Sequence, residues 1–319
     1  METLRWLFTK LRSLPRYTLI SLGAFCLAIF LLYYPLGMLA MNRIDDNADF
    51  KAGPQFDIEG GSHAVAMAEA LIDREVHGHH WVPNDPFFYP SSMLVRMPAF
   101  QRGIISSLSR FAVELSDQIG RARGSSQIDP DLEKAVGLLK YSPNVWIFDF
   151  STSLLPTTPS EDQYLGALAL FRNYNERLSK GQATFDRRAD NLMEALNRIS
   201  TDMGSSSAVI DSRIHAYSGK FMDTQAASNF YFIKGRMYTD YMLLRELKKD
   251  FAAIIKEKQL DDAWDNTLSS LHDGMEISHF LVFNASPSSQ FIPNHLAVQG
   301  FYLLRARTQL REVTNILLK

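Results

Sequence analysis

The longest apolar run in the chain extends from Tyr17 to Met41 and contains no charged residue. A hydrocarbon core about 30 Å thick requires roughly 20 apolar residues in a helix, so this run predicts a transmembrane helix over 17–41. A cleaved signal peptide usually has an apolar centre of about 7–15 residues, followed by small residues at the cleavage site. The run here is longer, and Met38 is too large for the −3 position of a site ending at Ala40. We therefore expect a retained membrane anchor.

Beyond this run, apolar residues recur at helical spacing and show no sustained strand-like alternation. The clearest stripe predicts an amphipathic helix that starts near Pro98 and ends at Gly124. Its members are Phe100, Ile104, Leu108, Phe111, Leu115 and Ile119. Similar patterns predict helices over 62–78, from Asp129, and over 160–178, 185–203, 210–217, 233–255, 260–282 and 294–317. The predicted fold class is all-α: a single N-terminal transmembrane helix followed by a helical bundle or paired-helix array.

Local signals refine the helix boundaries and the domain organisation. Ser160 and Gln163 are expected to form a capping box at the start of the 160–178 helix. Gly204 is expected to end the 185–203 helix. We divide the chain into a basic head (1–16), the anchor (17–41), a turn-rich linker (42–61) and a helical domain (62–319). Two subdomains that divide near 156–160 are the alternative to a single domain.

The charges on the two sides of the anchor predict its orientation. Lys and Arg outnumber acids before it, and acids outnumber bases after it, which places the N-terminus in the cytoplasm. Residues 42–319 then lie outside the inner membrane, in the periplasm of a bacterium. The charges are Arg5, Lys10, Arg12 and Arg16 against Glu2 before the anchor, and Arg43 against Asp45, Asp46 and Asp49 after it.

Composition excludes several functional classes for the exported part. The whole chain has a net charge of −2 and residues 1–41 carry +3, which leaves −5 for the rest and no basic stripe for nucleic acid. The only cysteine is Cys26, inside the anchor, so the exported part has no disulfide, no thiolate metal ligand and no cysteine nucleophile.

An unusual loop follows the first exported helix. The segment from Trp81 to Pro90 has too many prolines for a helix and too many aromatic residues for a disordered linker, so we expect an ordered loop with its rings buried against helices or a partner. A second proline-punctuated apolar segment, 141–155, is expected to be packed coil. The candidate partner-binding residues in the first loop are Trp81, Pro83, Asn84, Asp85, Pro86, Phe87 and Phe88.

Two histidine clusters are candidate metal sites. His77, His79 and His80 lie near acids, and imidazole with carboxylate suits a divalent metal, although hydrogen bonding at the end of a helix is the favoured interpretation. The second cluster, His272, Glu276 and His279, has the spacing of one helix face. It lacks the second Glu-x-x-His that carboxylate-bridged di-metal bundles require. We therefore expect no cofactor, with a divalent metal as the alternative.

The motifs of common hydrolases are missing from the sequence: Gly-x-Ser-x-Gly, Ser-x-x-Lys and His-Glu-x-x-His do not occur. The segments 79–88, 97–103 and 110–111 resemble an uncharacterised family of Gram-negative single-pass inner-membrane proteins, known only as a domain of unknown function. The likeness covers nearly the whole chain, anchor included. The resemblance implies a bacterial envelope location and an extensive periplasmic domain, and it brings no known activity or catalytic residues.

The leading functional hypothesis is a membrane-anchored, non-enzymatic scaffold or regulatory interaction protein of the cell envelope. Its expected partners are the lipid bilayer, through 17–41, and an envelope protein; a homo-oligomer is an additional expectation. One alternative is a metal-dependent hydrolase of envelope polymers or lipids that uses His77, His79 and His80. Another is a lipid-binding module, because methionine and aromatic side chains can line a cavity between helices.

Overall fold

The computed structural model describes residues 15–120, 128–148, 155–217, 223, 225–279, 281–286 and 288–319, and only the backbone of Leu19. Most of the basic head, the predicted helix end at Gly124 and part of the 141–155 coil lie outside these residues. Every regular element in the described ranges is helical, which confirms the all-α prediction. The α-helices are α2 (Arg16–Met41), α3 (His63–Asp73), α4 (Arg96–Glu114), α5 (Pro130–Leu139), α6 (Ser160–Ser179), α7 (Ala189–Tyr217), α8 (Ala226–Asp250), α9 (Ala252–Glu257), α10 (Asp261–Glu276) and α11 (His295–Leu317).

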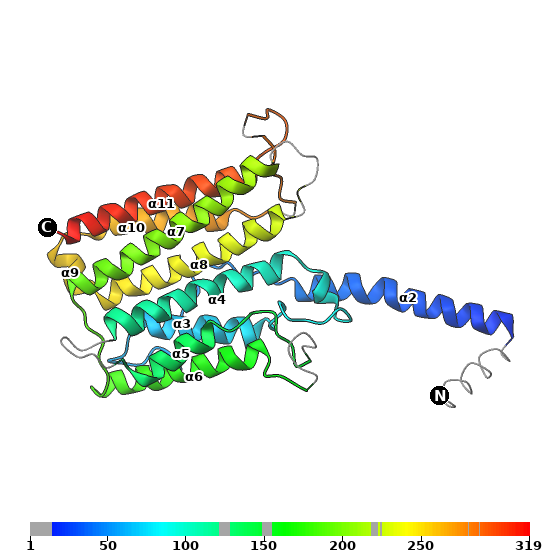
Figure 1. The fold of residues 1–319 in the computed structure, drawn as a ribbon, viewed down its shortest axis with the longest axis horizontal. Helices are drawn as coiled ribbons and strands as arrows, with labels where there is room; N and C mark the ends of the chain where they lie inside the picture. The colour runs from blue at the N-terminus through cyan, green and yellow to red at the C-terminus, as the bar shows by residue number, and fades with distance from the viewer. Residues whose placement is uncertain are drawn as a thin grey trace.

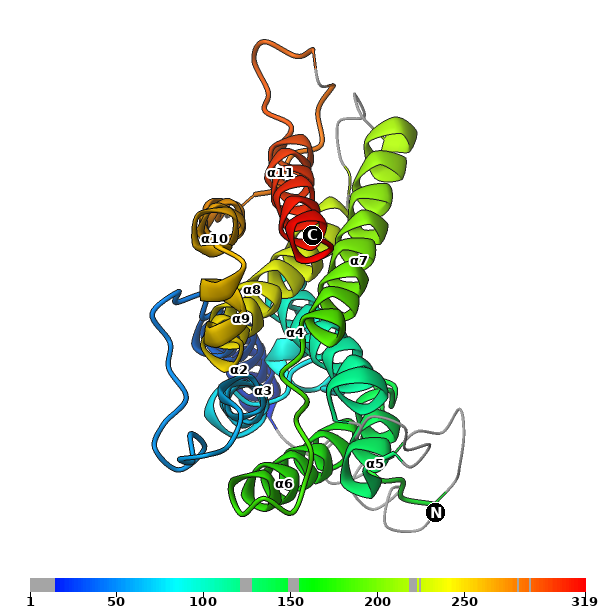
Figure 2. The same cartoon turned by 90° about the vertical axis from the view of Figure 1, so that its left-hand side faces the viewer.

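Two groups of roughly parallel helices make up the bundle (Figures 1 and 2). One group contains α7, α8, α10 and α11, and the other contains α3, α4, α5 and α6. Contacts of α3 and α4 with α8 join the groups, and one apolar core extends from α3 to α11. Short π-helical turns, η1 (Arg74–Gly78) and η3 (Leu115–Ile119), extend α3 and α4.

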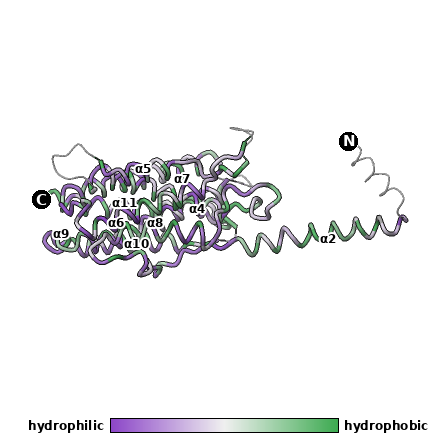
Figure 3. The backbone as a smooth tube through the Cα atoms, turned by 90° about the horizontal axis from the view of Figure 1, so that it is seen from below, coloured by the Kyte–Doolittle hydropathy of each residue, from purple (hydrophilic) through white to green (hydrophobic). Residues whose placement is uncertain are grey.

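The helix α2 projects from one end of this bundle (Figure 1), and it is apolar along its length (Figure 3). It is long and apolar enough to cross a membrane, either as a permanent span or as a signal sequence. We call this end of the bundle the anchor end. Its loops comprise residues 79–95, 140–148 and the described segments between 277 and 294, and the first of these contains the 3-10 turn η2 (Pro90–Met93).

The backbones of α4 and α8 lie in close contact where these helices join the two groups. A Cβ atom added to Gly103 would lie 2.1 Å from the carbonyl oxygen of Phe232, and one added to Gly235 would lie 2.2 Å from that of Phe100. Both positions therefore require glycine, although glycine costs about 1 kcal/mol relative to alanine inside a helix. The predicted stripe of α4, from Phe100 to Ile119, is buried throughout.

Two predicted helix boundaries are wrong. Gly204 does not end a helix, because α7 continues from Ala189 to Tyr217. The guanidinium of Arg307 on α11 packs 2.8 Å from where a Cβ of Gly204 would be, so contact with α11 holds the glycine within the helix. Ser160 does not cap α6. Its hydroxyl accepts from the amide of Val145 and donates to the carbonyl of Ser142, and so holds the preceding coil.

Other boundaries differ by smaller amounts. The predicted 233–255 helix breaks at Phe251, between α8 and α9. The predicted 260–282 helix stops at Glu276, because the chain leaves the helical conformation at Ile277. The predicted starts at Asp129 and Asn294 are confirmed: each side chain accepts hydrogen bonds from amides in the first turn of its helix.

The start of α3 is capped by side chains from its own segment and from α8. Ser62 accepts a hydrogen bond from the amide of Val65, and so caps the helix that was predicted to begin at this residue. The buried carboxylate of Asp250 accepts from the amides of His63 and Ala64 and from the hydroxyl of Ser62. A carboxylate at a helix N-terminus satisfies amides that lack partners and interacts favourably with the helix dipole. Asp250 thereby fixes the end of α8 against the start of α3.

A buried acid lies between α3 and α6. Glu69 is fully buried, and the guanidinium of Arg172 is 3.6 Å from its carboxylate. Burial raises the pKa of Glu69 to about 8, although the positive charge of Arg172 opposes this shift. The folded protein therefore binds a proton at Glu69 that the unfolded chain has lost between pH 4.5 and 8. Stability must fall as the pH rises through this range.

We predict that Glu69→Gln removes much of this pH dependence. The wild-type free energy of unfolding should decrease from pH 5 to pH 8.5 by up to several kcal/mol, at about 1.4 kcal/mol for each unit of pKa difference. The variant should show a flatter profile and be more stable than wild type at pH 8.5. Urea unfolding of the full chain in detergent measures this, with the exposed Glu257→Gln as control. A Glu69→Gln profile parallel to that of wild type would contradict the assignment.

Candidate functional site

The last two turns of α2 contact the first loop of the anchor end directly. The hydroxyl of Tyr33 donates to the carbonyl of Phe88 at 3.2 Å, and that of Tyr34 donates to the carbonyl of Phe87 at 3.0 Å. Gly37 faces Pro90 so closely that an added Cβ would lie 2.4 Å from the proline ring. The apolar helix is therefore seated against the bundle rather than joined to it by the chain alone.

The segment that follows α2 lies along α8 and is held by one side of that helix. Lys234, Tyr238 and Arg245 recur at spacings of 4 and 7, which places them on one helix face. Tyr238 donates to the carbonyl of Asn47, and Arg245 donates to the carbonyls of residues 48 and 50. The apolar side chain of Phe50 packs on the core as well. Residues 45–50 thus have defined positions on the bundle.

One of these contacts is an ion pair with a fully buried cation. The side chain of Lys234 is fully buried, and its ammonium lies 2.5 Å from a carboxylate oxygen of Asp46 and 2.9 Å from the carbonyl of Ile277. A buried ammonium without a partner is costly, so the folded state requires Asp46 in this position. The pair connects three separate parts of the chain: the segment after α2, the helix α8 and the loop after α10.

A second buried cation supports the same segment. Arg74 donates to Glu75 and to the hydroxyl of Tyr238 at 2.7 Å, and it lies 3.5 Å from Asp45. The guanidinium also stacks over the ring of Phe50, 4.7 Å from its centroid. Burial opposes the charge, but Glu75, Tyr238 and Asp45 together outweigh this effect, and the pKa of Arg74 is raised. Asp45 and Asp46 therefore each face a buried cation.

The seven residues of the predicted partner-binding loop have different environments. Trp81 is buried and donates to the carbonyl of Pro143, and Asn84 is buried and donates to the carbonyl of Val145. These bonds hold two loops of the anchor end together. Pro83, Asp85 and Pro86 are partly exposed. Among the seven, only Phe87 and Phe88 are exposed, by 82% and 45%.

The three histidines of this region pair with different carboxylates. His77 bonds to Asp73 at 2.8 Å on the surface, and His80 bonds to Asp85 at 3.0 Å. His79 lies apart from both and points toward Glu75, 3.6 Å away. The hydrogen bond to Asp85 raises the pKa of His80. Among the described residues, no group of three or more His, Cys, Asp or Glu side chains is arranged to hold a metal ion.

The second predicted histidine cluster is not a single helix face. His272 and Glu276 lie 3.5 Å apart on α10, but the helix ends at Glu276. His279 lies beyond it and stacks on His295 of α11, with ring centroids 3.7 Å apart. Burial lowers the pKa of both stacked rings. The positive charge of Lys234 lowers the pKa of His279 further, and the charge of His279 does the same for His295. This pair closes the base of the loop that precedes α11.

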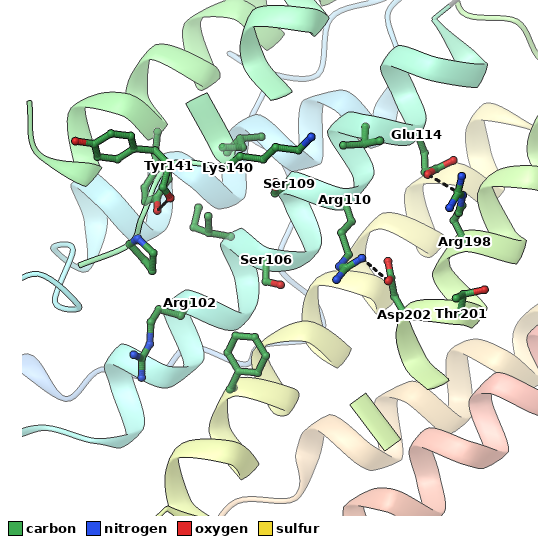
Figure 4. A pocket seen from close by; sticks show the side chains of 16 residues that line it. Arg102, Ser106, Ser109, Arg110, Glu114, Lys140, Tyr141, Arg198, Thr201 and Asp202 are labelled. Atoms are coloured by element: carbon green, nitrogen blue, oxygen red, sulfur yellow. Dashed lines mark hydrogen bonds and ion pairs between the residues drawn. The ribbon is translucent and has the colours of Figure 1, made fainter. Parts of the chain in front are cut away.

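A groove of about 690 Å³ runs between α4, α7 and the end of α5 (Figure 4). Its apolar floor includes Ile105, Val113, Leu139 and Phe232. Its polar lining contains the cations Arg102, Arg110, Lys140 and Arg198, the acids Glu114 and Asp202, and the hydroxyls of Ser106, Ser109, Tyr141, Tyr164 and Thr201.

The acids of the groove are already paired, and two of the cations are not. Arg110 lies 2.6 Å from Asp202, and Arg198 lies 3.5 Å from Glu114. Burial raises the pKa of Glu114 to about 7. No carboxylate in the described part of the chain lies within ion-pair distance of the other two cations, Arg102 and Lys140. The groove is therefore positive within a domain that is acidic as a whole.

Residues 58–229, more than half of the chain, match the model of a family described as an uncharacterized protein conserved in bacteria (DUF2333). The chain belongs to this family. The match includes α3 to α7 with the loop 79–95, so it confirms the family resemblance predicted from that loop. No curated protein and no solved structure matches the chain significantly.

Sequence reasoning missed the residues that attach α2 to the bundle. Lys234 and Arg74 each lie within or next to apolar helical runs, where a cation needs a buried acidic partner. Asp45 and Asp46 follow the end of α2 by four and five residues, and from the sequence they were interpreted only as an orientation signal. The signal that connects them is this pair of buried cations with a pair of adjacent acids, but pairing across the sequence requires the fold.

We predict that Asp46→Asn destabilises the protein by about 3–5 kcal/mol, because it leaves the ammonium of Lys234 buried without a countercharge. Asp49→Asn, at an exposed position in the same segment, should cost less than about 0.5 kcal/mol. Urea unfolding followed by tryptophan fluorescence measures both changes.

The double variant Asp46→Asn with Lys234→Met removes both charges and should recover most of the lost stability, because replacing a buried ion pair by neutral groups is often close to neutral. Equal stability losses for Asp46→Asn and Asp49→Asn would show that the ion pair does not hold the segment.

Proposed function

We propose that this protein is a membrane-anchored, non-enzymatic scaffold or regulatory interaction protein of the bacterial cell envelope. In this proposal α2 spans the inner membrane with the N-terminus in the cytoplasm, and residues 42–319 lie in the periplasm. The observation that carries the proposal is the attachment of α2 and residues 45–50 to the bundle through Tyr33, Tyr34 and the Asp46–Lys234 pair. Such an attachment holds the domain in one orientation to the bilayer, which a scaffold requires.

The helix α11 offers a surface on which another envelope protein can bind. Val298, Phe301 and Leu304 lie at spacings of three residues along it and are exposed by 46%, 59% and 43%. Exposed apolar stripes of this kind are typical of protein interaction sites. A scaffold whose orientation is fixed presents this stripe at a constant angle to the membrane.

A photo-crosslinking amino acid at Phe301 tests the proposal in living cells. We expect a discrete crosslinked product that contains a second envelope protein, and no such product from the same residue at Lys256, which is exposed on α9. A product that contains only further copies of this chain, or no product at all, would contradict the scaffold role.

The groove favours a second candidate function, the binding of an anionic amphiphile. Its apolar floor suits an acyl or prenyl chain, and the cations Arg102 and Lys140 beside two serine hydroxyls suit a phosphate or carboxylate. Burial lowers the pKa of Arg102, and its Nε donates only to the carbonyl of Pro98, 3.2 Å away. An anionic group would therefore satisfy a partly buried cation.

Native mass spectrometry of the full chain, released from detergent, tests this second function. We expect a lipid adduct on the wild-type protein, and at least a fivefold weaker adduct on the variant with Arg102→Gln and Lys140→Gln. The control variant, Lys180→Gln, changes an exposed cation after the end of α6 and should keep the adduct. Equal adduct intensities in all three proteins would exclude the groove as the binding site.

A further inference from the structure

Exposed apolar side chains gather on the loops of the anchor end. The loop after α3 exposes Phe87 by 82% and Met93 by 62%. The loop before α11 exposes Leu281 by 61%, Phe291 by 94% and Ile292 by 50%. These two loops are separated in the sequence by most of the domain, and both lie at the end from which α2 projects (Figure 1). Loop tips in water are usually polar, so this gathering requires an apolar neighbour.

The position of α2 shows which neighbour lies there. At a rise of about 1.5 Å per residue, Tyr33 and Tyr34 lie about 26 Å along the helix from Arg16, and Gly37 lies about 32 Å along it. With Arg16 at the cytoplasmic face of a core about 30 Å thick, these residues lie at its outer boundary. Tyr33 and Tyr34 bond to the backbone of Phe88 and Phe87, so the exposed rings lie at the depth of the lipid headgroups.

The remaining loops reach the same plane because the bundle and α2 extend in similar directions. Figure 1 shows α2 continuing the long direction of the bundle, so that the anchor end faces the bilayer. The loop before α11 lies on the opposite side of this end from α3 and α6 (Figure 2). It is held to the bundle by Asn284, which donates to Asp223, and by the backbone bond from His295 to Phe283. The base of this loop therefore has a fixed place on the face, and its apolar tip extends from it.

We propose that the anchor end is a second membrane-binding surface, which inserts Phe87, Phe88 and Met93 on one side and Leu281, Phe291 and Ile292 on the other into the outer leaflet of the bilayer. The partner is lipid, because the anchor brings these side chains to headgroup depth, where aromatic and aliphatic side chains of a peripheral surface partition favourably. The inference rests on the proposed anchoring by α2, and it adds that the periplasmic domain lies on the membrane rather than above it.

Lipid-dependent quenching of a fluorophore tests this surface in the full chain, reconstituted in nanodiscs of phosphatidylethanolamine and phosphatidylglycerol. A polarity-sensitive dye is attached to single cysteines made by Phe87→Cys, Phe291→Cys or Leu318→Cys in a Cys26→Ser background. Leu318 is 68% exposed and lies at the far end of the bundle (Figure 1). We expect lipid with a nitroxide near the headgroup to quench the dye at positions 87 and 291 at least twofold more than at 318.

Position 291 decides the outcome, because position 87 lies beside α2 whichever way the domain faces. Quenching at 87 alone, or equal quenching at 291 and 318, would overturn the proposal. The wild-type chain, with a dye on native Cys26 and a nitroxide deep in the acyl chains, reports on the anchor itself. Loss of that quenching would mean that α2 does not span the bilayer, so failure of the anchoring is distinguished from failure of the surface.

Discussion

The contact on which the arrangement of this molecule depends is the ion pair between Asp46 and Lys234. The ammonium of Lys234 is fully buried, so it is stable only while Asp46 and the carbonyl of Ile277 lie beside it. Asp46 follows α2 by five residues, which leaves little freedom between the anchor and α8. A charge pair of this kind contributes little net stability compared with apolar packing, but breaking it is costly, and this asymmetry selects one position for the segment.

The other contacts around α2 also fix the position of this helix and of the segment after it on the bundle. Tyr33 and Tyr34 bind the backbone of the first loop, and Arg74 of η1 and Arg245 of α8 bind the segment after α2. Because these contacts come from both helix groups, they also hold the groups together at the anchor end. The cluster of exposed apolar residues follows from the same geometry, since it faces the side on which α2 leaves the bundle. All lining residues of the groove between α4 and α7 except Phe232 lie within the part of the chain that matches the bacterial family.

Much of the fold could be predicted from the sequence, because periodic apolar stripes and capping residues determine helices locally. The stripe from Phe100 to Ile119 and the helix starts at Ser62, Asp129 and Asn294 were predicted correctly. The errors arose where tertiary contacts override local preference: Gly204 stays helical against Arg307, and the hydroxyl of Ser160 binds a neighbouring coil. The attachment of α2 depends on pairing between residues almost 190 positions apart, which no local pattern encodes. Tertiary contacts also decide which aromatic rings of the 81–90 loop are buried: Trp81 is buried and Phe87 is exposed.

The fixed orientation of the anchor is the central claim, and a distance distribution between spin labels tests it most directly. Native Cys26 carries one label in α2, and Ser205→Cys carries the other at an exposed position of α7, since residues 42–319 contain no cysteine of their own. Double electron–electron resonance on the full chain in nanodiscs then measures the distance between the two labels. Our account predicts a single narrow distribution, as expected for one rigid body. A broad or multimodal distribution would show that α2 is a flexible tether and would contradict the account.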